Sequence, residues 1–536
     1  MWPRDAGRMR NQPGNARFID SIKNLIRQNR AKQCIVVGFR RRPERTDTQK
    51  RGDASLEGEN LIARQEMQMP EDIARRFLVR GLAICALIWV GLYNGYPTVF
   101  SDTGSYLLTG KFFVALAPFR APGYSVFTNL ASFGSSAWFV IVIQAVLVAY
   151  VLHLTCIHLL DGARKFADYW FLAGIGVMAA LTSLPWTVSL LMPDVFAGVL
   201  FLAAYLLAFS DTFRPLQRIF LATILAISVA AHASLFPIAA LLIAGLVLHR
   251  YFAGPAGALP SAKALVGWLL IPFIFAGLLT AELNREMNVG FRISPSGNAF
   301  LLARLFGDGL AADYLRDTCQ ERHFYSCRYL SHLPRTQGEF LFWHPLYPEL
   351  LKGRQAEMDE IVRGAISAYP ARFAISSLKE SILQFTNLRT GDEIRSYGAK
   401  EWNSGAVPRV FPGDVKAFGN SRQYHDRLTS LADAAARIDT AMFWLSLAAC
   451  VAFARMGRNE RKGHNGRMNT FFYASLFYLV INASVCASFA GVYDRYQSRV
   501  AWIVPFCLTA FLGIPVRDWK PWKSTENVEE LEVGAE

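Results

Sequence analysis

The feature that most constrains this chain of 536 residues is a series of apolar runs, each about as long as a helix that crosses a lipid bilayer. A helix of about 17 to 25 apolar residues spans a hydrocarbon core roughly 30 Å thick. Because unpaired backbone groups are costly in hydrocarbon, the runs favour helices over open strands. Ten runs qualify, near residues 79–98, 137–159, 168–184, 193–210, 217–233, 235–251, 264–281, 438–455, 470–489 and 498–515.

Composition agrees with this interpretation. The chain is 52% hydrophobic and only 18% charged, which is too apolar for an ordinary soluble protein. We therefore expect an all-α polytopic membrane protein with about ten transmembrane helices and a large extracytoplasmic loop domain. His232 and Pro237 predict the turn that divides the stretch 217–251 into two helices.

Positive charge predicts the orientation, because short loops rich in Lys and Arg stay in the cytoplasm. The loops of the opposite side carry few basic residues. Both termini are therefore expected in the cytoplasm and residues 282–437 outside it, with the protein in a bacterial-type inner (plasma) membrane. The basic residues on alternate loops are Arg164, Lys165, Arg214, Arg218, Arg250, Lys263, Arg455, Arg458, Arg461, Lys462 and Arg467.

The chain divides into five expected segments. They are a basic tail (1–76), a seven-span block (77–281), the loop domain (282–437), a three-span block (438–515) and a second cytoplasmic tail (516–536). Residues 1–51 hold fourteen basic and four acidic residues, so most of the net charge of +14 lies there. The tail either attracts anionic lipids or is a disordered extension, and Met67 or Met69 is an alternative natural start. No nucleic acid partner is expected.

The loop domain holds two cysteines and three expected helices. In an oxidising compartment Cys319 and Cys327 are candidates for a disulfide, whereas a zinc site lacks a paired C-x-x-C. Helices are expected near 345–351, 358–369 and 369–385. The last places Phe373, Leu378, Ile382 and Phe385 at helical spacing, which suits either the bilayer surface or packing within the loop domain.

Several polar residues gather on the outer face of this topology. Asp102 follows the first span, where it either caps a short helix or acts as a base. Apolar and aromatic neighbours would disfavour its charged form and so strengthen it as a proton acceptor. Lys111 and Arg120 come next, as phosphate ligands or as ordinary interfacial anchors, and Tyr124 suits the membrane interface.

Further polar residues reach the same face from later spans. Asp194 follows Pro193 at an expected helix start, where it caps the helix or contacts a ligand. His232 lies in the turn after the fifth span. Asp494, Arg495 and Arg499 precede the last span, and the two arginines, four apart on a helix, either bind one anionic headgroup or anchor the interface.

These motifs resemble those of the C superfamily of glycosyltransferases, which are integral membrane enzymes that use polyprenyl-phosphate sugars. Asp102 matches an acidic residue of the first outer loop, and Arg120-Ala-Pro-Gly-Tyr124 matches a Pro-Gly-Tyr turn. Asp494-Arg495-Tyr496, followed by Pro505, matches a late Arg-Tyr motif. Thr103 stands where many members have a second acid, so a divalent metal stays open but has no acidic pair to support it, and no other cofactor is expected.

The resemblance implies transfer of a sugar from a polyprenyl-phosphate donor to an envelope glycan, lipid or protein on the outer face. Asp102 would be the general base. Lys111, Arg120, Arg495 and Arg499 would bind the donor phosphate, Tyr124, Asp194, His232 and Asp494 would complete the substrate site, and Trp343, His344 and Trp402 would form an acceptor surface. Membrane lipids are the other expected partner.

Two alternatives remain open. A transporter or flippase of lipid-linked saccharides would carry charges inside its spans and repeated halves with broken helices. The spans are almost free of charge and no repeat is evident. A non-catalytic subunit for envelope polysaccharide assembly is the second alternative.

Overall fold

The computed structural model describes residues 74–75, 77–115, 120–160, 164–210, 213–252, 262–295, 297–391, 394, 402–456 and 464–518. It divides the chain into two units, Met1–Glu71 and Asp72–Glu536, and every described residue belongs to the second. The two expected tails therefore lie almost entirely outside the described residues. So do Arg458, Arg461 and Lys462, and the side chains of Arg164, Lys165, Lys263 and Trp402.

The described residues form helices joined by loops and no strand, apart from one isolated bridge between Thr98 and Leu190. Within the described ranges, five helices are long and apolar enough to cross a membrane: Ala137–Leu159, Leu235–Phe252, Ala264–Glu286, Thr429–Met456 and Gly466–Ala490. Four shorter apolar helices accompany them: Phe77–Leu87, Phe166–Leu181, Val195–Phe209 and Pro215–Ala231. The chain is thus an all-α, membrane-embedded protein, as its apolar runs predicted.

The first expected span differs from a continuous helix over 79–98. Helix Phe77–Leu87 stops at Ile88 and the chain resumes as the short α3 (Trp89–Asn94). Gly95 ends α3 with a φ of 83°, a left-handed conformation that glycine adopts without a steric penalty. The residues from Tyr96 onward therefore leave the helix and form the loop that carries Asp102.

Two short helices follow, α4 (Thr103–Phe112) and α5 (Pro122–Ala131), and they pack against each other. Pro122 occupies the first turn of α5, where its missing N–H costs nothing. A Cβ on Gly123 would lie 2.1 Å from the carbonyl oxygen of Ala230, so only glycine lets α5 approach this closely. That contact brings the Arg120 turn beside the end of α10 (Pro215–Ala231).

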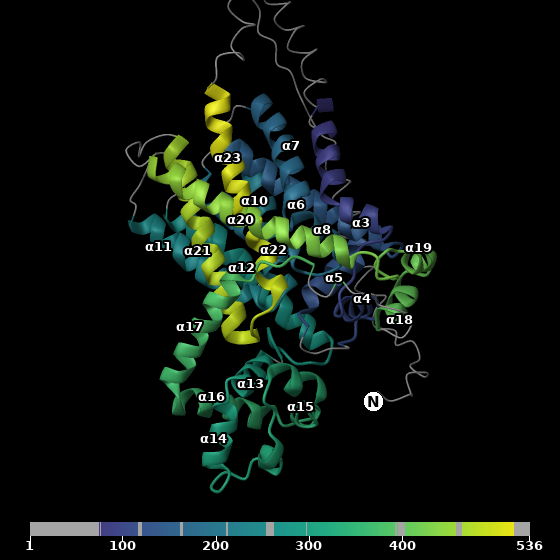
Figure 1. Cartoon of the computed structure of the whole chain (residues 1–536), viewed down its shortest axis with the longest axis vertical. Helices are drawn as coiled ribbons and strands as arrows, with labels where there is room; N and C mark the ends of the chain where they lie inside the picture. Colours follow the sequence, from purple (N-terminus) through teal and green to yellow (C-terminus); the bar gives the residue numbers. More distant parts are fainter. Residues whose placement is uncertain are drawn as a thin grey trace, which may run out of the picture. The chain divides into compact units, whose positions relative to one another are not determined.

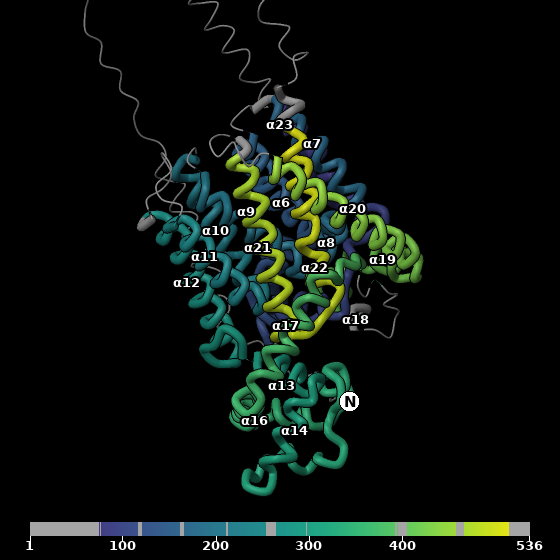
Figure 2. Tube along the Cα trace, turned by 60° about the vertical axis from the view of Figure 1, so that its left-hand side comes forward, coloured from purple at the N-terminus to yellow at the C-terminus, as the bar shows by residue number. Residues whose placement is uncertain are grey.

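The helices α6 (Ala137–Leu159), α7 (Arg164–Leu181), α8 (Leu184–Ser189) and α9 (Val195–Phe209) continue the bundle (Figures 1 and 2). Ser136 caps α6 by accepting a hydrogen bond from the backbone N–H of Trp138. After α10 the chain breaks at His232 and restarts as α11 (Leu235–Phe252), which is the division that His232 and Pro237 predicted. α12 (Ala262–Glu286) follows.

The long segment between α12 and the last helices carries its own core. We call it the α13–α16 cluster: α13 (Gly297–Gly307), α14 (Leu310–Thr318), η1 (Tyr325–His332), η2 (Glu339–Trp343), α15 (Leu346–Leu351) and α16 (Gln355–Ala368). Leu302, Leu305, Leu315, Phe340 and Ile361 pack together inside it. Two of the three helices expected in the loop domain are therefore present as α15 and α16.

The third expected helix is α17 (Pro370–Thr386), which packs against α21 (His464–Ala490) (Figures 1 and 2). The residues of its predicted apolar stripe do not all pack against the same core. Phe373 packs against the α13–α16 core and Phe385 against the core of the bundle. Leu378 and Ile382 stay exposed, because neither core reaches the middle of the helix.

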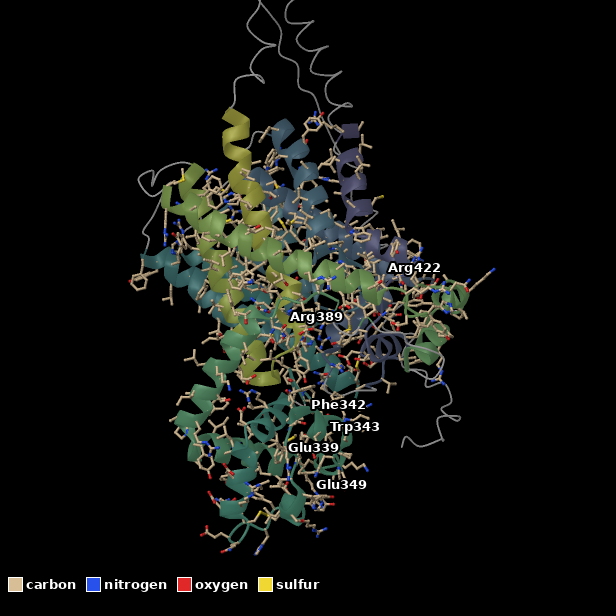
Figure 3. All side chains as sticks on the ribbon, viewed as in Figure 1. Glu339, Phe342, Trp343, Glu349, Arg389 and Arg422 are labelled. Atoms are coloured by element: carbon tan, nitrogen blue, oxygen red, sulfur yellow. A yellow bond between two sulfur atoms is a disulfide. The ribbon has the colours of Figure 1, made fainter. Side chains whose placement is uncertain are left out.

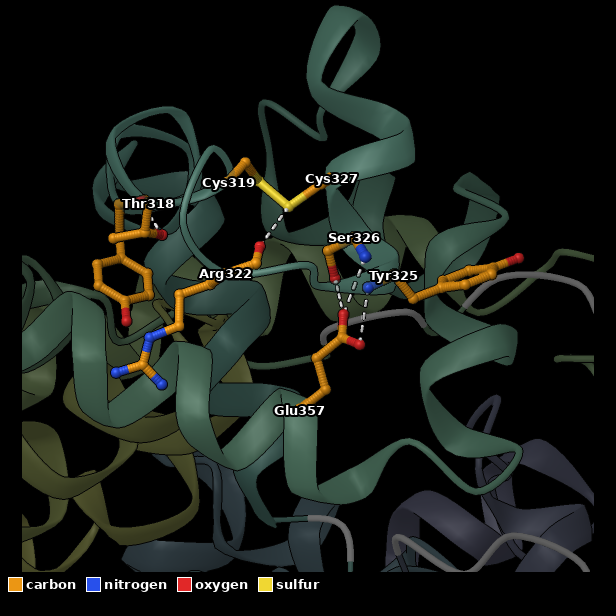
Figure 4. The surroundings of a disulfide bond; sticks show 8 residues. Thr318, Cys319, Arg322, Tyr325, Ser326, Cys327 and Glu357 are labelled. Atoms are coloured by element: carbon orange, nitrogen blue, oxygen red, sulfur yellow. Dashed lines mark hydrogen bonds between the residues drawn. A yellow bond between two sulfur atoms is a disulfide. The ribbon is translucent and has the colours of Figure 1, made fainter.

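A disulfide joins Cys319 and Cys327 in the α13–α16 cluster (Figure 4). The enclosed loop leads into η1, where Glu357 of α16 accepts hydrogen bonds from the backbone N–H groups of Tyr325 and Ser326, both at 2.9 Å. The Ser326 hydroxyl donates to the same carboxylate at 2.7 Å. The two cysteines and Glu357 thus tie η1 to α14 and α16.

The remaining helices close the bundle. α18 (Trp402–Val410), η3 (Pro412–Asp414) and α19 (Val415–Gly419) form a short group, and α18 packs against α4. α20 (Thr429–Met456) and α21 are long apolar helices. The short α22 (Asp494–Ala501) then leads into α23 (Ile503–Asp518), so Arg495 and Arg499 lie on α22.

Candidate functional site

A cavity of about 470 Å³ lies where the Asp102 loop, the turn between α10 and α11, α21 and α22 meet the α13–α16 cluster. Its volume falls within the roughly 300–1,000 Å³ range of small-molecule sites. The bundle contributes Asp102, Arg120, His232 and Arg495 to its lining. Four of the residues singled out from the sequence therefore meet around one cavity, although they come from distant parts of the chain.

Asp102 stands immediately before α4, but its carboxylate makes no capping hydrogen bond to that helix. The carboxylate instead forms an ion pair with Arg120, and its other oxygen lies 3.7 Å from a guanidinium nitrogen of Arg495. The sequence predicted aromatic and apolar neighbours for this acid, whereas the structure also places two cations beside it. Arg120 and Arg495 thus hold the carboxylate by its two oxygens at the wall of the cavity.

The loop that carries Asp102 is held by hydrogen bonds to the segment before α9. The backbone N–H of Thr98 donates to the Ser189 carbonyl at 2.9 Å, and the Leu191 N–H donates to the Thr98 carbonyl at the same distance. The Thr103 hydroxyl donates to the Leu191 carbonyl at 3.0 Å. The position of Asp102 is therefore set on both sides by buried backbone contacts.

Asp194 is a second carboxylate, buried behind the cavity at the start of α9. The capping role expected for it is not observed, because its side chain makes no capping hydrogen bond. It lies 3.4 Å from a guanidinium nitrogen of Arg499 and 3.9 Å from one of Arg495. Arg499 also donates to the Asn482 side-chain oxygen at 2.9 Å.

Arg495 thus lies between the two acids, with Asp102 on the cavity side and Asp194 behind. Burial opposes its charge, but Asp194, Tyr496 and Asp102 raise the pKa of Arg495 well above its ordinary value. The two carboxylates and the three arginines leave one positive charge in excess. This arrangement attracts an anion to the cavity, and two guanidinium groups suit a phosphate.

His232 ends α10 and holds Ser234 through its ring, with Nδ1 2.8 Å from the Ser234 hydroxyl. Burial and the nearby guanidinium groups of Arg499, Arg495 and Arg120 lower the pKa of His232 well below its ordinary value. The imidazole is therefore neutral at physiological pH. It adds hydrogen-bonding capacity to the cavity without adding charge.

The structure places five of the proposed site residues away from the cavity lining. Lys111 is exposed in the last turn of α4, so it does not share a phosphate with Arg120. Tyr124 is buried and donates to the Gln144 side-chain oxygen at 2.8 Å, which is a packing role. Asp494 lies 4.0 Å from Arg389, whereas Asp194 and Arg499 stand behind Arg495.

The expected acceptor surface is only partly assembled. Trp343 is 84% exposed beside Phe342, which lines the cavity (Figure 3). His344 is buried, and its Nε2 lies 2.8 Å from the His332 carbonyl, so it serves the cluster's own packing. In the described part of the chain no group of three or more His, Cys, Asp or Glu side chains is arranged to hold a metal ion.

Sequence reasoning missed the polar residues that the α13–α16 cluster and the connection leading into it supply. Arg292, Asn298, Gln355 and Asp359 all line the cavity. They belong to no motif, and no spacing links them, because two precede α13 or begin it while the other two lie on α16. Only the fold brings them together.

Comparison with known protein families, with curated proteins and with solved structures gave no match to this chain.

Proposed function

We propose that this protein is a membrane glycosyltransferase that moves a sugar from a polyprenyl-phosphate donor to an acceptor on the outer face of a bacterial-type inner membrane. The observation that carries the proposal is the position of Asp102 on the cavity wall between Arg120 and Arg495. Such a site combines a proton acceptor with two phosphate ligands. The resemblance of its motifs to the C superfamily of glycosyltransferases supplies the donor class.

The proposal includes the full topology expected from the sequence. Ten spans, cytoplasmic termini and an extracytoplasmic α13–α16 cluster would put the cavity at the level of the outer lipid headgroups. A lipid-borne phosphate could then reach Arg120 and Arg495 while its isoprenoid chain stayed in the bilayer.

In the proposed reaction the donor phosphate takes over part of the hydrogen bonding that Arg120 and Arg495 now give to Asp102. The released carboxylate accepts the proton of an acceptor hydroxyl group. The oxygen of that hydroxyl group bonds to the anomeric carbon of the donor sugar at the same time. The bond between that carbon and the phosphate oxygen breaks, and the electron pair leaves with polyprenyl phosphate. The two guanidinium groups stabilise the negative charge that develops on this leaving group.

The test is the substitution Asp102→Asn in a deletion strain, with the surface glycans analysed by mass spectrometry. Asn keeps the size of the side chain but cannot accept the proton, so the sugar missing from the deletion strain should stay missing. Asp433→Asn is the matched control, since Asp433 is exposed and pairs with Arg389 outside the cavity. Normal glycans with Asp102→Asn at wild-type protein levels would refute the proposed catalytic role.

One observation favours the transporter alternative, namely the buried Asp194, Arg495 and Arg499 network inside the bundle, since charges buried among spans often line a transport path. Reconstituted vesicles separate the two functions. A flippase would move a lipid-linked saccharide unaltered across the vesicle membrane, whereas the proposed enzyme would release polyprenyl phosphate.

A further inference from the structure

One part of the cavity lining is polar but lies away from the bundle. We call it the outer polar wall: Arg292 and Asn298, around the connection between α12 and α13, and Gln355 and Asp359, one turn apart on α16. The wall is built as two hydrogen-bonded pairs. The Asn298 amide donates to Asp359 at 2.5 Å, and Arg292 donates to the Gln355 side-chain oxygen at 3.5 Å.

The two pairs hold the wall in place, and each of the four side chains keeps hydrogen-bond donors or acceptors that a ligand can use. A carboxylate has about four lone-pair sites, an amide both donates and accepts, and a guanidinium has five N–H donors. The wall therefore offers donors and acceptors side by side. Its one cation and one anion cancel, so it favours a neutral ligand with many hydroxyl groups over an anion.

An exposed aromatic ring lines the same cavity as this wall. Phe342, which is labelled in Figure 3, lines the cavity. Its side chain is 71% exposed. A sugar ring combines hydroxyl groups at its edge with an apolar C–H face, and an aromatic ring can cover that face. An acyl chain would leave the remaining donors and acceptors of these four side chains unsatisfied, which is costly when water is displaced.

We propose that the outer polar wall and Phe342 bind the acceptor, and that this acceptor is a neutral saccharide. The inference rests on the proposed function, because it assigns the acceptor side of the same cavity. The donor phosphate occupies the bundle side at Arg120 and Arg495, and the acceptor sugar lies between the wall and Asp102. Asp359 is then a positioning and specificity residue that fixes which hydroxyl group faces Asp102.

The experiment measures saccharide binding by the full-length protein in nanodiscs that contain undecaprenyl phosphate. The probe is an array of bacterial surface oligosaccharides. Wild-type protein should bind a subset of neutral glycans, and Asp359→Asn or Phe342→Ala should weaken that binding about tenfold, the loss expected for one charge-assisted hydrogen bond or one stacked ring. Glu360→Gln is the matched control, since Glu360 is the next residue along α16 and pairs with Arg322 outside the cavity.

Phe342→Ala keeps the test decisive even where Asp359→Asn disturbs folding, because Phe342 is largely exposed. Absence of glycan binding by the wild-type protein would overturn the inference. Equal binding by wild type, Asp359→Asn and Phe342→Ala would overturn it too, as would selective capture of acidic glycans on the same array.

The two proposals fail in distinguishable ways. Transfer in cells tests the reaction through Asp102→Asn, whereas glycan binding tests the wall through Asp359→Asn and Phe342→Ala. Intact surface glycans in the Asp102→Asn strain would defeat the proposed reaction. Unchanged array binding by the wall variants, with transfer still lost in Asp102→Asn, would defeat only the saccharide assignment.

Discussion

Gln423 holds Val99 by both ends of its side-chain amide. Its oxygen accepts the backbone N–H of Val99 at 2.9 Å, and its NH₂ group donates to the Val99 carbonyl at 2.7 Å. The backbone N–H of Gln423 donates in turn to the Asn94 side chain at 2.7 Å. A segment just before α20 therefore fixes the loop three residues ahead of Asp102, in the way a neighbouring strand would.

We expect Gln423→Leu to displace the Asp102 loop. The substitution keeps the size of the buried side chain but leaves the N–H and carbonyl of Val99 without their partner, which costs about 1–3 kcal/mol for each buried group. Thermal unfolding in detergent should report that loss, and glycan transfer should fall about tenfold or more.

A graded series makes the role of Gln423 specific. Gln423→Glu keeps an acceptor for the Val99 N–H but removes the donor for its carbonyl, so its activity should lie between wild type and Gln423→Leu. Arg422→Gln is the control, because Arg422 is the neighbouring residue and stacks over Tyr93 on the surface. Wild-type transfer with Gln423→Leu would contradict the positioning role.

The second prediction concerns the buried pair of Asp194 and Arg499. Asp194→Asn leaves the Arg499 charge buried with less compensation, and breaking such a pair costs about 3–5 kcal/mol. The double variant Asp194→Asn with Arg499→Met removes both charges and should regain much of the lost stability. Thermal unfolding of the purified variants in detergent measures this double-mutant cycle.

The exposed acid Asp313, which pairs with Arg316 and Arg372, provides the matched control. Asp313→Asn should change stability by about 1 kcal/mol or less, because exposed ion pairs are weak. A double variant no more stable than Asp194→Asn alone would contradict the idea that uncompensated buried charge is the cause.

The third prediction uses the Cys319–Cys327 disulfide. A bond that closes so short a loop stabilises the folded state by about 2–3 kcal/mol in the chain-entropy account. Cys319→Ser with Cys327→Ser should therefore lower the thermal stability of the α13–α16 cluster, measured by proteolysis of the loop.

In cells these two cysteines should resist alkylation until a reductant is added, since the proposed topology puts them in an oxidising compartment. Free thiols in untreated cells would place the cluster on the cytoplasmic side.

Helices were the part of this fold that the sequence predicted best. Apolar runs report which stretches leave water, and Pro and Gly positions mark their ends, so the break at His232 and the start of α17 at Pro370 match the pattern. The first expected span is too long, because apolar residues continue beyond Gly95, where the left-handed backbone ends α3.

The site was predictable only in part, for a related reason. Asp102, Arg120 and Arg495 were found because short motifs near the ends of spans marked them. Lys111 and Tyr124 belong to the same motifs, yet α4 carries one away from the cavity and the bundle core buries the other. Periodicity shows which face of a helix is apolar but not which helices meet.

The fourth prediction is a pH dependence that originates at His232. Its pKa is lowered in the folded protein by burial and by Arg499, Arg495 and Arg120, whereas the unfolded chain has the ordinary value near 6.5. Below pH 6.5 the unfolded state therefore binds a proton that the folded state does not, and folding stability falls as the pH decreases. Above that pH the residue is neutral in both states and does not change the stability with pH.

His232→Asn removes the titrating group while keeping an acceptor for the Ser234 N–H, which in the wild-type protein donates to Nδ1 of His232 at 3.2 Å. Between pH 7.5 and 5.5 wild-type protein should lose up to about 1.4 kcal/mol more than His232→Asn, because one pH unit below the unfolded pKa corresponds to that free energy when the folded imidazole stays neutral. Chemical unfolding of both proteins in detergent across this range measures the difference, and parallel pH profiles would show that the imidazole is not held neutral by its surroundings.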